Sequence, residues 1–146
     1  MRQFRPLLRG DIPLLIRMTR DNMAAIVHSS WGMEWTDEPL LEWLSDPDIS
    51  TEVLEEDDEP IGYYSLEFVD NYVFVTSIQL RKDRQGCGYG ELMMDRIEHM
   101  AIEKHIEGVE LCVQETNDRA KSFYEHIGYD TVCRRGNNYL MRKRLL

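Results

Sequence analysis

The stretch Gln85-Gly86-Cys87-Gly88-Tyr89-Gly90 is the most informative part of this chain. It lies between a β-branched and aromatic run at 72–80 and a segment in which apolar residues recur at helical spacing from Met93 to Ala101. Alternating glycines let the backbone adopt positive φ angles and approach a ligand closely. The N-terminus of the following helix adds unpaired N–H groups and a positive dipole end. Together these features predict an anion site suited to a pyrophosphate.

Two other phosphate-binding loops fit this stretch poorly. A Walker A loop requires a Lys-Ser or Lys-Thr pair after its last glycine, and none follows Gly90. A Rossmann fingerprint reads G-x-G-x-x-G and has an acidic residue at the end of the next strand. Here the spacing is G-x-G-x-G, and Glu110 stands at the beginning of its strand. Nucleotide hydrolysis and dinucleotide redox chemistry are therefore disfavoured. Three cations directly before the loop, in an otherwise acidic chain, still favour an anionic ligand: Arg81, Lys82 and Arg84.

Outward from the loop, apolar periodicity and turn residues predict the element order β-α-α-β-β-β-α-β-α-β-β. The expected N-terminal elements are a strand at 2–8, a helix from Asp11 to about Val27, a break at 29–35, a helix from about Thr36 to Asp46, and strands at 51–54, 61–69 and 72–80. The expected C-terminal elements are a helix from Gly90 to near Glu107-Gly108, a strand at 109–113, a helix from Asn117 to Gly128, and a hairpin at 130–134 and 138–144. Adjacent strands with short turns imply antiparallel pairing.

Length and composition restrict the class of protein. The chain has 146 residues, of which 42% are apolar, and a net charge of −10. These values predict one domain over 1–146 with its own core. The acidic balance argues against a nucleic-acid binder, which needs clustered cations. No apolar run approaches the roughly 18 residues of a membrane span, and the first residues lack the apolar stretch of a secretory signal. We therefore expect no membrane contact and a cytoplasmic location.

Cysteine and histidine residues give no sign of a metal centre. The three cysteines are widely spaced without a C-x-x-C pair, and the four histidines form no ligand pair. We expect reduced thiols and no bound metal. The residues concerned are Cys87, Cys112, Cys133, His28, His99, His105 and His126.

Two segments resemble motifs of the GCN5-related N-acetyltransferase (GNAT) superfamily. The stretch 85–90 is similar to its Q/R-x-x-G-x-G/A acyl-CoA loop. The segment 117–129 is similar to its N-x-x-A-x-x-x-Y-x-x-x-G-F/Y pattern, and Phe4-Arg5-Pro6 followed by Asp11-Ile12-Pro13 resembles its first strand and helix start. One helix and one strand separate the two motifs, as in the family, and the element order agrees over the whole chain. The resemblance implies an α/β (α+β) fold with a mixed, mostly antiparallel central sheet whose strands splay, flanked by helices.

The resemblance also implies an activity and a set of site residues. It implies an N-acetyltransferase that uses acetyl-CoA as cosubstrate, with an amine attacking the thioester directly and no acyl-enzyme. Acetyl-CoA would lie where the strands 72–80 and 109–113 diverge. Tyr124 occupies the position of the usual general acid. The implied cofactor contacts are Ile78, Gln79, Leu80, Arg84, Gln85, Gly86, Cys87, Gly88, Tyr89, Gly90 and Asn117.

The general base departs from the family pattern. Some members that act on peptide termini carry Glu or His on the fifth strand, where this chain has Cys112, and a thiol is a poor substitute for a carboxylate. Glu67, on the strand before the hairpin, is one candidate base. Glu34, in the Trp-rich break, is a candidate base or acceptor-site residue, and a water chain to bulk solvent is an equal alternative. Trp31 and Trp35 either pack in the core or line the acceptor pocket.

The acceptor and the oligomeric state remain broad expectations. The acidic surface favours a cationic acceptor, such as a peptide N-terminus, a lysine, a polyamine or an aminoglycoside. Because no base is assigned, a non-catalytic acyl-CoA-binding or sensing module on the same fold is the alternative function. We expect a monomer or a homodimer.

Overall fold

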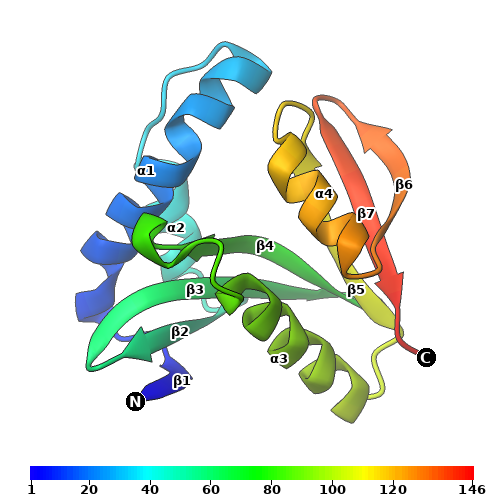
Figure 1. Ribbon diagram of the computed structural model, residues 1–146, viewed down its shortest axis with the longest axis horizontal. Coiled ribbons are helices and arrows are strands. Elements are labelled where there is room, and N and C mark those ends of the chain that lie inside the picture. Colours follow the sequence, from blue (N-terminus) through cyan, green and yellow to red (C-terminus); the bar gives the residue numbers. More distant parts are fainter.

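Seven strands form one twisted sheet in the computed structural model, which describes residues 1–146 (Figure 1). The order across the sheet is β1-β2-β3-β4-β5-β7-β6, and all neighbours pair antiparallel except β4 and β5, which are parallel. The strands are β1 (Arg2–Pro6), β2 (Ser50–Glu56), β3 (Glu59–Val69), β4 (Tyr72–Leu80), β5 (Gly108–Gln114), β6 (Asp130–Arg135) and β7 (Asn138–Arg144).

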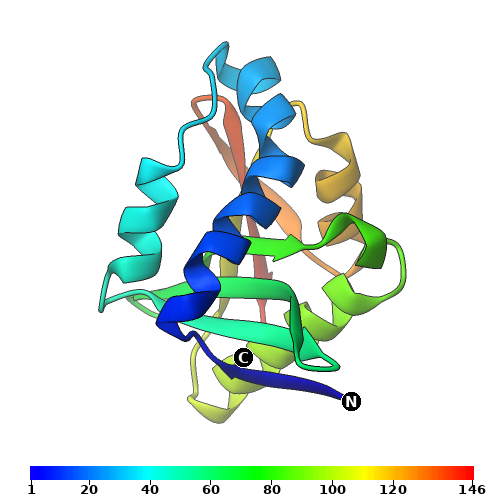
Figure 2. The same ribbon diagram turned by 90° about the vertical axis from the view of Figure 1, so that its left-hand side faces the viewer.

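Helices cover both faces of the sheet, because the strands alternate apolar side chains to either side. The helices are α1 (Ile12–Trp31), α2 (Glu38–Ser45), α3 (Tyr89–Glu103) and α4 (Asp118–His126), with short 3₁₀ turns η1 (Arg9–Asp11) and η2 (Lys82–Arg84). Figure 2 shows α1 and α2 in front of the strands, where Leu15 and Leu40 pack on Val53 and Tyr63. The larger core cluster lies between the sheet and α3 with α4. No helix has both the length and the apolar character that a bilayer span requires. The predicted fold class and element order are confirmed.

The parallel pair β4–β5 is short, and this shapes the molecule. Pairing runs only from Tyr72 opposite Gly108 to Val75 opposite Leu111. Beyond those pairs the two strands diverge, and β5 continues in register with β7 as far as Gln114 (Figure 1). The sequence-based expectation that these strands splay is therefore confirmed.

The first helix is longer than the sequence suggested, and this prediction was wrong. We expected its end near Val27, whereas α1 continues to Trp31 and ends at Gly32, whose N–H donates to His28 O over 2.8 Å. Contacts from distant segments hold the last turn. The Ser30 hydroxyl lies 2.7 Å from Thr116 Oγ1, and Asn137 Nδ2 donates to Ser30 O over 2.6 Å. Such tertiary contacts outweigh the weak helix propensity of serine.

The end of α3 also differs from the expectation. The helix stops at Glu103 rather than near Glu107-Gly108. The chain turns at His105, which has a positive φ of 57°, and Ile106 N–H donates to Ala101 O over 2.9 Å. Gly108 is the first residue of β5, not a helix terminator.

Candidate functional site

The glycine loop opens α3 with the geometry that an anion requires. Gly86 and Gly88 have φ angles of 77° and 89°, and Gly88 is the N-cap residue of the helix. No heavy atom lies within 4 Å of the position that a Cβ on Gly88 would occupy, so the space in front of the helix N-terminus is open. The first N–H groups of a helix have no partner within it. Open space and free N–H groups together fit a pyrophosphate.

Asn22 on α1 fixes the loop to the end of β4, a role that sequence reasoning missed. Its Nδ2 donates to Gln79 Oε1 at 3.0 Å and to Leu80 O at 2.7 Å. Gln85 Nε2 donates to Asn22 Oδ1 and to Leu80 O, both over 3.1 Å. The side chains of Gln79 and Gln85 therefore position the loop. The only sequence signal was a polar residue within the apolar spacing of the first helix.

The cations near the loop differ in whether a carboxylate pairs with them. Arg84 pairs with Glu56 at 3.1 Å, and Arg81 pairs with Asp83 at 2.6 Å, so nearby carboxylates neutralise both. Arg119 on α4 has no ion-pair partner, and its Nη2 lies 4.0 Å from the position of a Cβ on Gly86. Arg119 and Lys82, which also lacks an ion-pair partner, are thus the unpaired cations near the loop. The sequence placed Arg119 two residues after Asn117, within the second motif, but gave it no role.

The free edge of β4 faces the gap between the diverging strands. Arg81 N–H donates to Ile61 O on β3, so alternation points the backbone of Gln79 toward β3 and that of Ile78 and Leu80 toward the gap. Leu80 O is already bonded to Asn22 and Gln85. The backbone groups of β4 that face the gap and remain free to bind a ligand are therefore the N–H and C=O of Ile78 and the N–H of Leu80.

A β-bulge lies just before this free edge. The register moves from Ser65 opposite Ser77 to Leu66 opposite Val75, so Thr76 has no opposite residue on β3, although its hydroxyl donates to Ser65 O over 3.1 Å. Bulges redirect backbone groups and are common beside active sites. The bulge turns the backbone near Thr76 at the point where β4 leaves β5.

Tyr124 combines a buried ring with an accessible hydroxyl. The residue is 8% exposed, and its ring packs edge-on against Phe123 and Tyr129, with centroids 5.2 and 5.8 Å apart. Its hydroxyl makes no hydrogen bond within the protein, yet the only buried side-chain polar atom without a partner is Asn138 Oδ1. The Tyr124 hydroxyl is therefore open to solvent or ligand. Burial raises the pKa of Tyr124, which keeps the hydroxyl protonated at neutral pH.

Tyr124 and the glycine loop belong to one site because α4 touches the start of α3. A Cβ on Gly90 would lie 3.3 Å from Phe123 Cζ. Asn117 Oδ1 accepts a hydrogen bond from Ala120 N–H at 3.3 Å and so caps α4, as expected for an Asn at the start of a helix. Cys87 is exposed on the loop, and the Tyr89 hydroxyl donates to Glu56 on β2.

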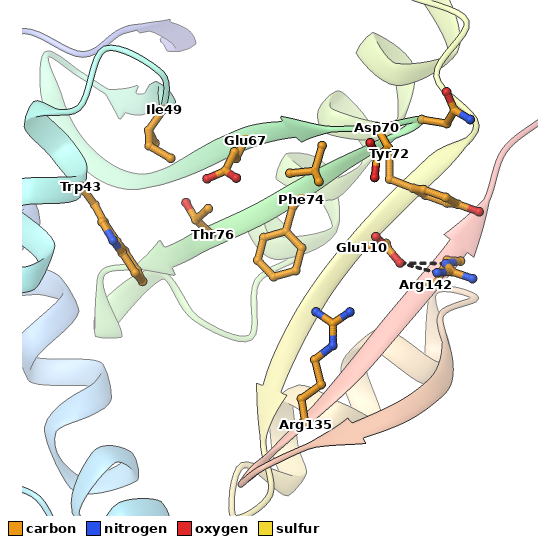
Figure 3. A pocket seen from close by; sticks show the side chains of 12 residues that line it. Trp43, Ile49, Glu67, Asp70, Tyr72, Phe74, Thr76, Glu110, Arg135 and Arg142 are labelled. Atoms are coloured by element: carbon orange, nitrogen blue, oxygen red, sulfur yellow. Dashed lines mark hydrogen bonds and ion pairs between the residues drawn. The ribbon is translucent and has the colours of Figure 1, made fainter.

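A cavity of about 620 Å³ lies on the face of the sheet opposite to α3 and α4 (Figure 3). Its floor is the half of the sheet that α1 and α2 leave uncovered. Glu67 lies in it without an ion-pair partner, whereas Glu110 is bonded to Arg142 at 2.6 Å. The lining residues are Trp43, Ile49, Glu67, Val69, Asp70, Asn71, Tyr72, Phe74, Thr76, Glu110, Arg135 and Arg142.

The other candidate residues lie outside this cavity. Glu34 is exposed in the segment between α1 and α2. Trp35 packs on the α1–α2 core and donates from Nε1 to Asp37 Oδ1 at 2.6 Å, and Trp31 is on the last turn of α1. The tryptophan of the cavity is Trp43, which sequence reasoning did not single out. Burial raises the pKa of the Cys112 thiol, which makes it a weak base or nucleophile at neutral pH.

Comparisons with known proteins agree with this geometry. A family model described as "Acetyltransferase (GNAT) family" matches residues 16–129. A [ribosomal protein bS18]-alanine N-acetyltransferase of Haemophilus influenzae is 31% identical over 84 residues, which is 58% of this chain and 57% of that protein. The chain thus matches little more than half the length of this relative.

Two solved structures share the fold over nearly all of the chain. One is PaiA N-acetyltransferase from Thermoplasma acidophilum in complex with coenzyme A, with a TM-score of 0.80, 20% identity and 99% coverage of both chains. The other is the ribosomal-protein-S18-alanine N-acetyltransferase from Escherichia coli, with a TM-score of 0.76, 16% identity and coverage of 99% of this chain and 94% of that one.

Proposed function

The chain belongs to the acetyltransferase (GNAT) family, and on that basis we propose that it transfers an acetyl group from acetyl-CoA to a primary amine. The observation that carries the proposal is the divergence of β4 from β5 after Val75. Around this gap lie the free backbone edge at Ile78, the open N-terminus of α3 at Gly88 and the α4 helix that bears Tyr124. We further propose that residues 1–146 act as one acetyltransferase domain.

Each part of the site has a task in this reaction. The N–H groups of residues 86–90 and the Arg119 guanidinium hold the pyrophosphate, and the backbone of Ile78 and Leu80 pairs with the pantetheine arm. Acetyl-CoA supplies the activated thioester. The amine nitrogen forms a bond to the thioester carbon, the C–S bond breaks, and the Tyr124 hydroxyl gives a proton to the departing sulfur. The nitrogen loses its own proton to a base or to water.

Among the candidate bases, Glu67 has the strongest support, because it lines the cavity beside Thr76 without an ion-pair partner. Glu34 is the weaker candidate, since it lies outside that cavity. A peptide N-terminus, a lysine or a small cationic amine is the proposed acceptor. The net charge of −10 and the relative that acetylates an alanine of bS18 both support an amine of this kind.

A non-catalytic acyl-CoA-binding protein is the second candidate function. One observation favours it: β5 presents Cys112, whose pKa is raised, where a carboxylate base would be expected. The two functions differ in turnover and not in cofactor binding.

The deciding experiment measures thiol release from acetyl-CoA with a panel of amines, together with the thermal shift that CoA produces. The proposed enzyme gives amine-dependent release and saturable stabilisation by CoA that exceeds stabilisation by NAD or ATP. Stabilisation by CoA without release from any amine supports the second candidate. No preference for CoA refutes both.

A further inference from the structure

We propose that the acceptor of this enzyme carries a carboxylate near its reactive amine, and that Arg135 recognises this carboxylate. The inference rests on the proposed function and narrows its substrate class to zwitterionic amines. A free amino acid and a peptide with an acidic side chain near its N-terminus both have this chemistry.

The first argument is the direction and pairing of Arg135. It is the last residue of β6, and Figure 3 shows its guanidinium pointing into the cavity toward Phe74. No carboxylate pairs with it. Its neighbour Arg134, by contrast, bonds to Glu115 and lies over the Tyr139 ring, 5.9 Å from the centroid. Adjacent strand residues point to opposite faces, so of the two only Arg135 reaches the cavity.

The second argument is the balance of charge in the cavity. Arg142 is neutralised by Glu110 through contacts of 2.9 and 2.6 Å. The charges without partners are the carboxylates of Glu67 and Asp70 and the guanidinium of Arg135. A ligand that leaves the guanidinium unpaired forgoes a charge-assisted interaction that a carboxylate would gain there. A zwitterion satisfies both signs, with its ammonium group toward the carboxylates and its carboxylate on Arg135.

The third argument is where these groups lie along the strands. Leu111 is level with Val75, so the next residues of the two strands, Cys112 and Thr76, stand where β4 and β5 separate. Cys112 is opposite Leu140, and Leu140 is opposite Cys133, two residues before Arg135. The long side chain of Arg135 returns from this open end into the cavity that Thr76 lines. An amine at the strand separation therefore has Arg135 on its β6 side.

The wall opposite Arg135 is apolar, which suits the body of such an acceptor. Trp43 and Ile49 form it, and Trp43 is 48% exposed although it is a large aromatic residue. An acceptor with an apolar side chain would cover Trp43 while its carboxylate meets Arg135. The bidentate guanidinium favours a planar carboxylate over a single hydroxyl or amide oxygen.

The experiment compares acceptors that differ only in the carboxylate. An apolar amino acid is paired with its carboxamide, and an amidated peptide with an acidic second residue is paired with the same peptide carrying the amide side chain. For each pair kcat/KM is measured in the wild-type protein and in Arg135→Gln, Arg135→Lys and Arg134→Gln. Amine pKa values differ within a pair, but this difference is common to all variants and cancels when variants are compared. Arg134→Gln is the matched control, since it removes the same charge one residue away on the other face.

The expected result is a preference of the wild-type enzyme for one carboxylate form, which Arg135→Gln reduces by about 10- to 100-fold, the loss of a hydrogen bond to a charged group. Arg135→Lys keeps part of the preference, and Arg134→Gln keeps all of it. Whichever pair shows the effect identifies the amino-acid or the peptide source. An enzyme that turns over amines with no Arg135-dependent preference overturns the inference and leaves the proposed function intact. If no amine is turned over, the proposed function fails, and calorimetric titration of CoA-saturated protein with the same pairs decides whether Arg135 binds the carboxylate.

Discussion

Replacement of Tyr124 by phenylalanine separates catalysis from packing, because the structure gives the hydroxyl no packing role. The hydroxyl has no hydrogen-bond partner in the protein, so its removal leaves no buried group unpaired. The ring keeps its edge contacts with Phe123 and Tyr129. We therefore expect the free energy of unfolding to change by less than about 0.5 kcal/mol. A positioned general acid contributes about 10²–10⁴ in rate, or roughly 3–5 kcal/mol of barrier, and kcat should fall by that factor.

Tyr129→Phe is the matched control for this variant. The Tyr129 hydroxyl donates to the buried carboxylate of Glu98 over 2.9 Å, and Lys143 Nζ bonds to the other oxygen of Glu98. Its loss should lower the free energy of unfolding by about 1–3 kcal/mol with little effect on kcat. The two variants thus have opposite signatures in thermal melts and in kinetics.

The assay must isolate the chemical step, because slow product release masks it in kcat. Single-turnover rates of acetyl transfer are measured at saturating amine, together with the acetyl-CoA dissociation constant, which should change little. Tyr124→Phe rates within about threefold of wild type would refute the assignment of Tyr124 as the acid. A loss of stability with an unchanged rate per folded molecule would show instead that Tyr124 is a core residue.

Three further predictions concern the cofactor loop and the fold. Gly88→Glu should abolish CoA binding in calorimetry while thermal melts stay cooperative, because the residue has a φ of 89° and faces the proposed pyrophosphate; normal binding would place the phosphate elsewhere. Arg119→Gln should weaken CoA binding about tenfold and Arg81→Gln much less, since Arg81 is bonded to Asp83 whereas Arg119 is unpaired; equal effects would contradict the pairing argument. Arg5→Met should destabilise the protein at pH 7 and progressively less as the pH falls below about 3.9 in urea titrations. Arg5 bonds to Asp11 at 2.8 Å and holds the pKa of Asp11 below its ordinary value. The pair therefore stabilises the fold fully above about pH 3.9 and loses this contribution as the pH falls through the lowered pKa. A destabilisation that does not depend on pH would disprove this account.

Features governed by short-range chemistry could be predicted from the sequence. The β-branched run at 72–80 gave both ends of β4, because tight turns bound it on either side. The positive φ angles at Gly86 and Gly88 and the cap at Asn117 followed from residue type and position alone. The same kind of reasoning placed Tyr124 on a helix, whereas its place at the site came from the family resemblance.

Features that depend on contacts between distant residues were missed for one physical reason. The last turn of α1 is held by Ser30 and Thr116, which are 86 positions apart, and Asn22 meets Leu80 across 58 positions. The pairing of Arg84 with Glu56 and the isolation of Arg135 are likewise set by which strands become neighbours. No local pattern encodes such distances, and a cation in a sequence looks the same whether or not a carboxylate neutralises it.

The short seam between β4 and β5 also has a mechanical consequence. Four residue pairs are all that join the block β1–β4 to the block β5–β7–β6 along the sheet. We therefore expect the two blocks to move against each other at this seam, opening and closing the wedge beyond it, with the core between the sheet and α3 limiting the motion. The pantetheine arm of CoA, paired with the backbone of Ile78, would fill this wedge and join the two blocks. Amide hydrogens in the two blocks should therefore exchange at more similar rates when CoA is bound than when it is absent.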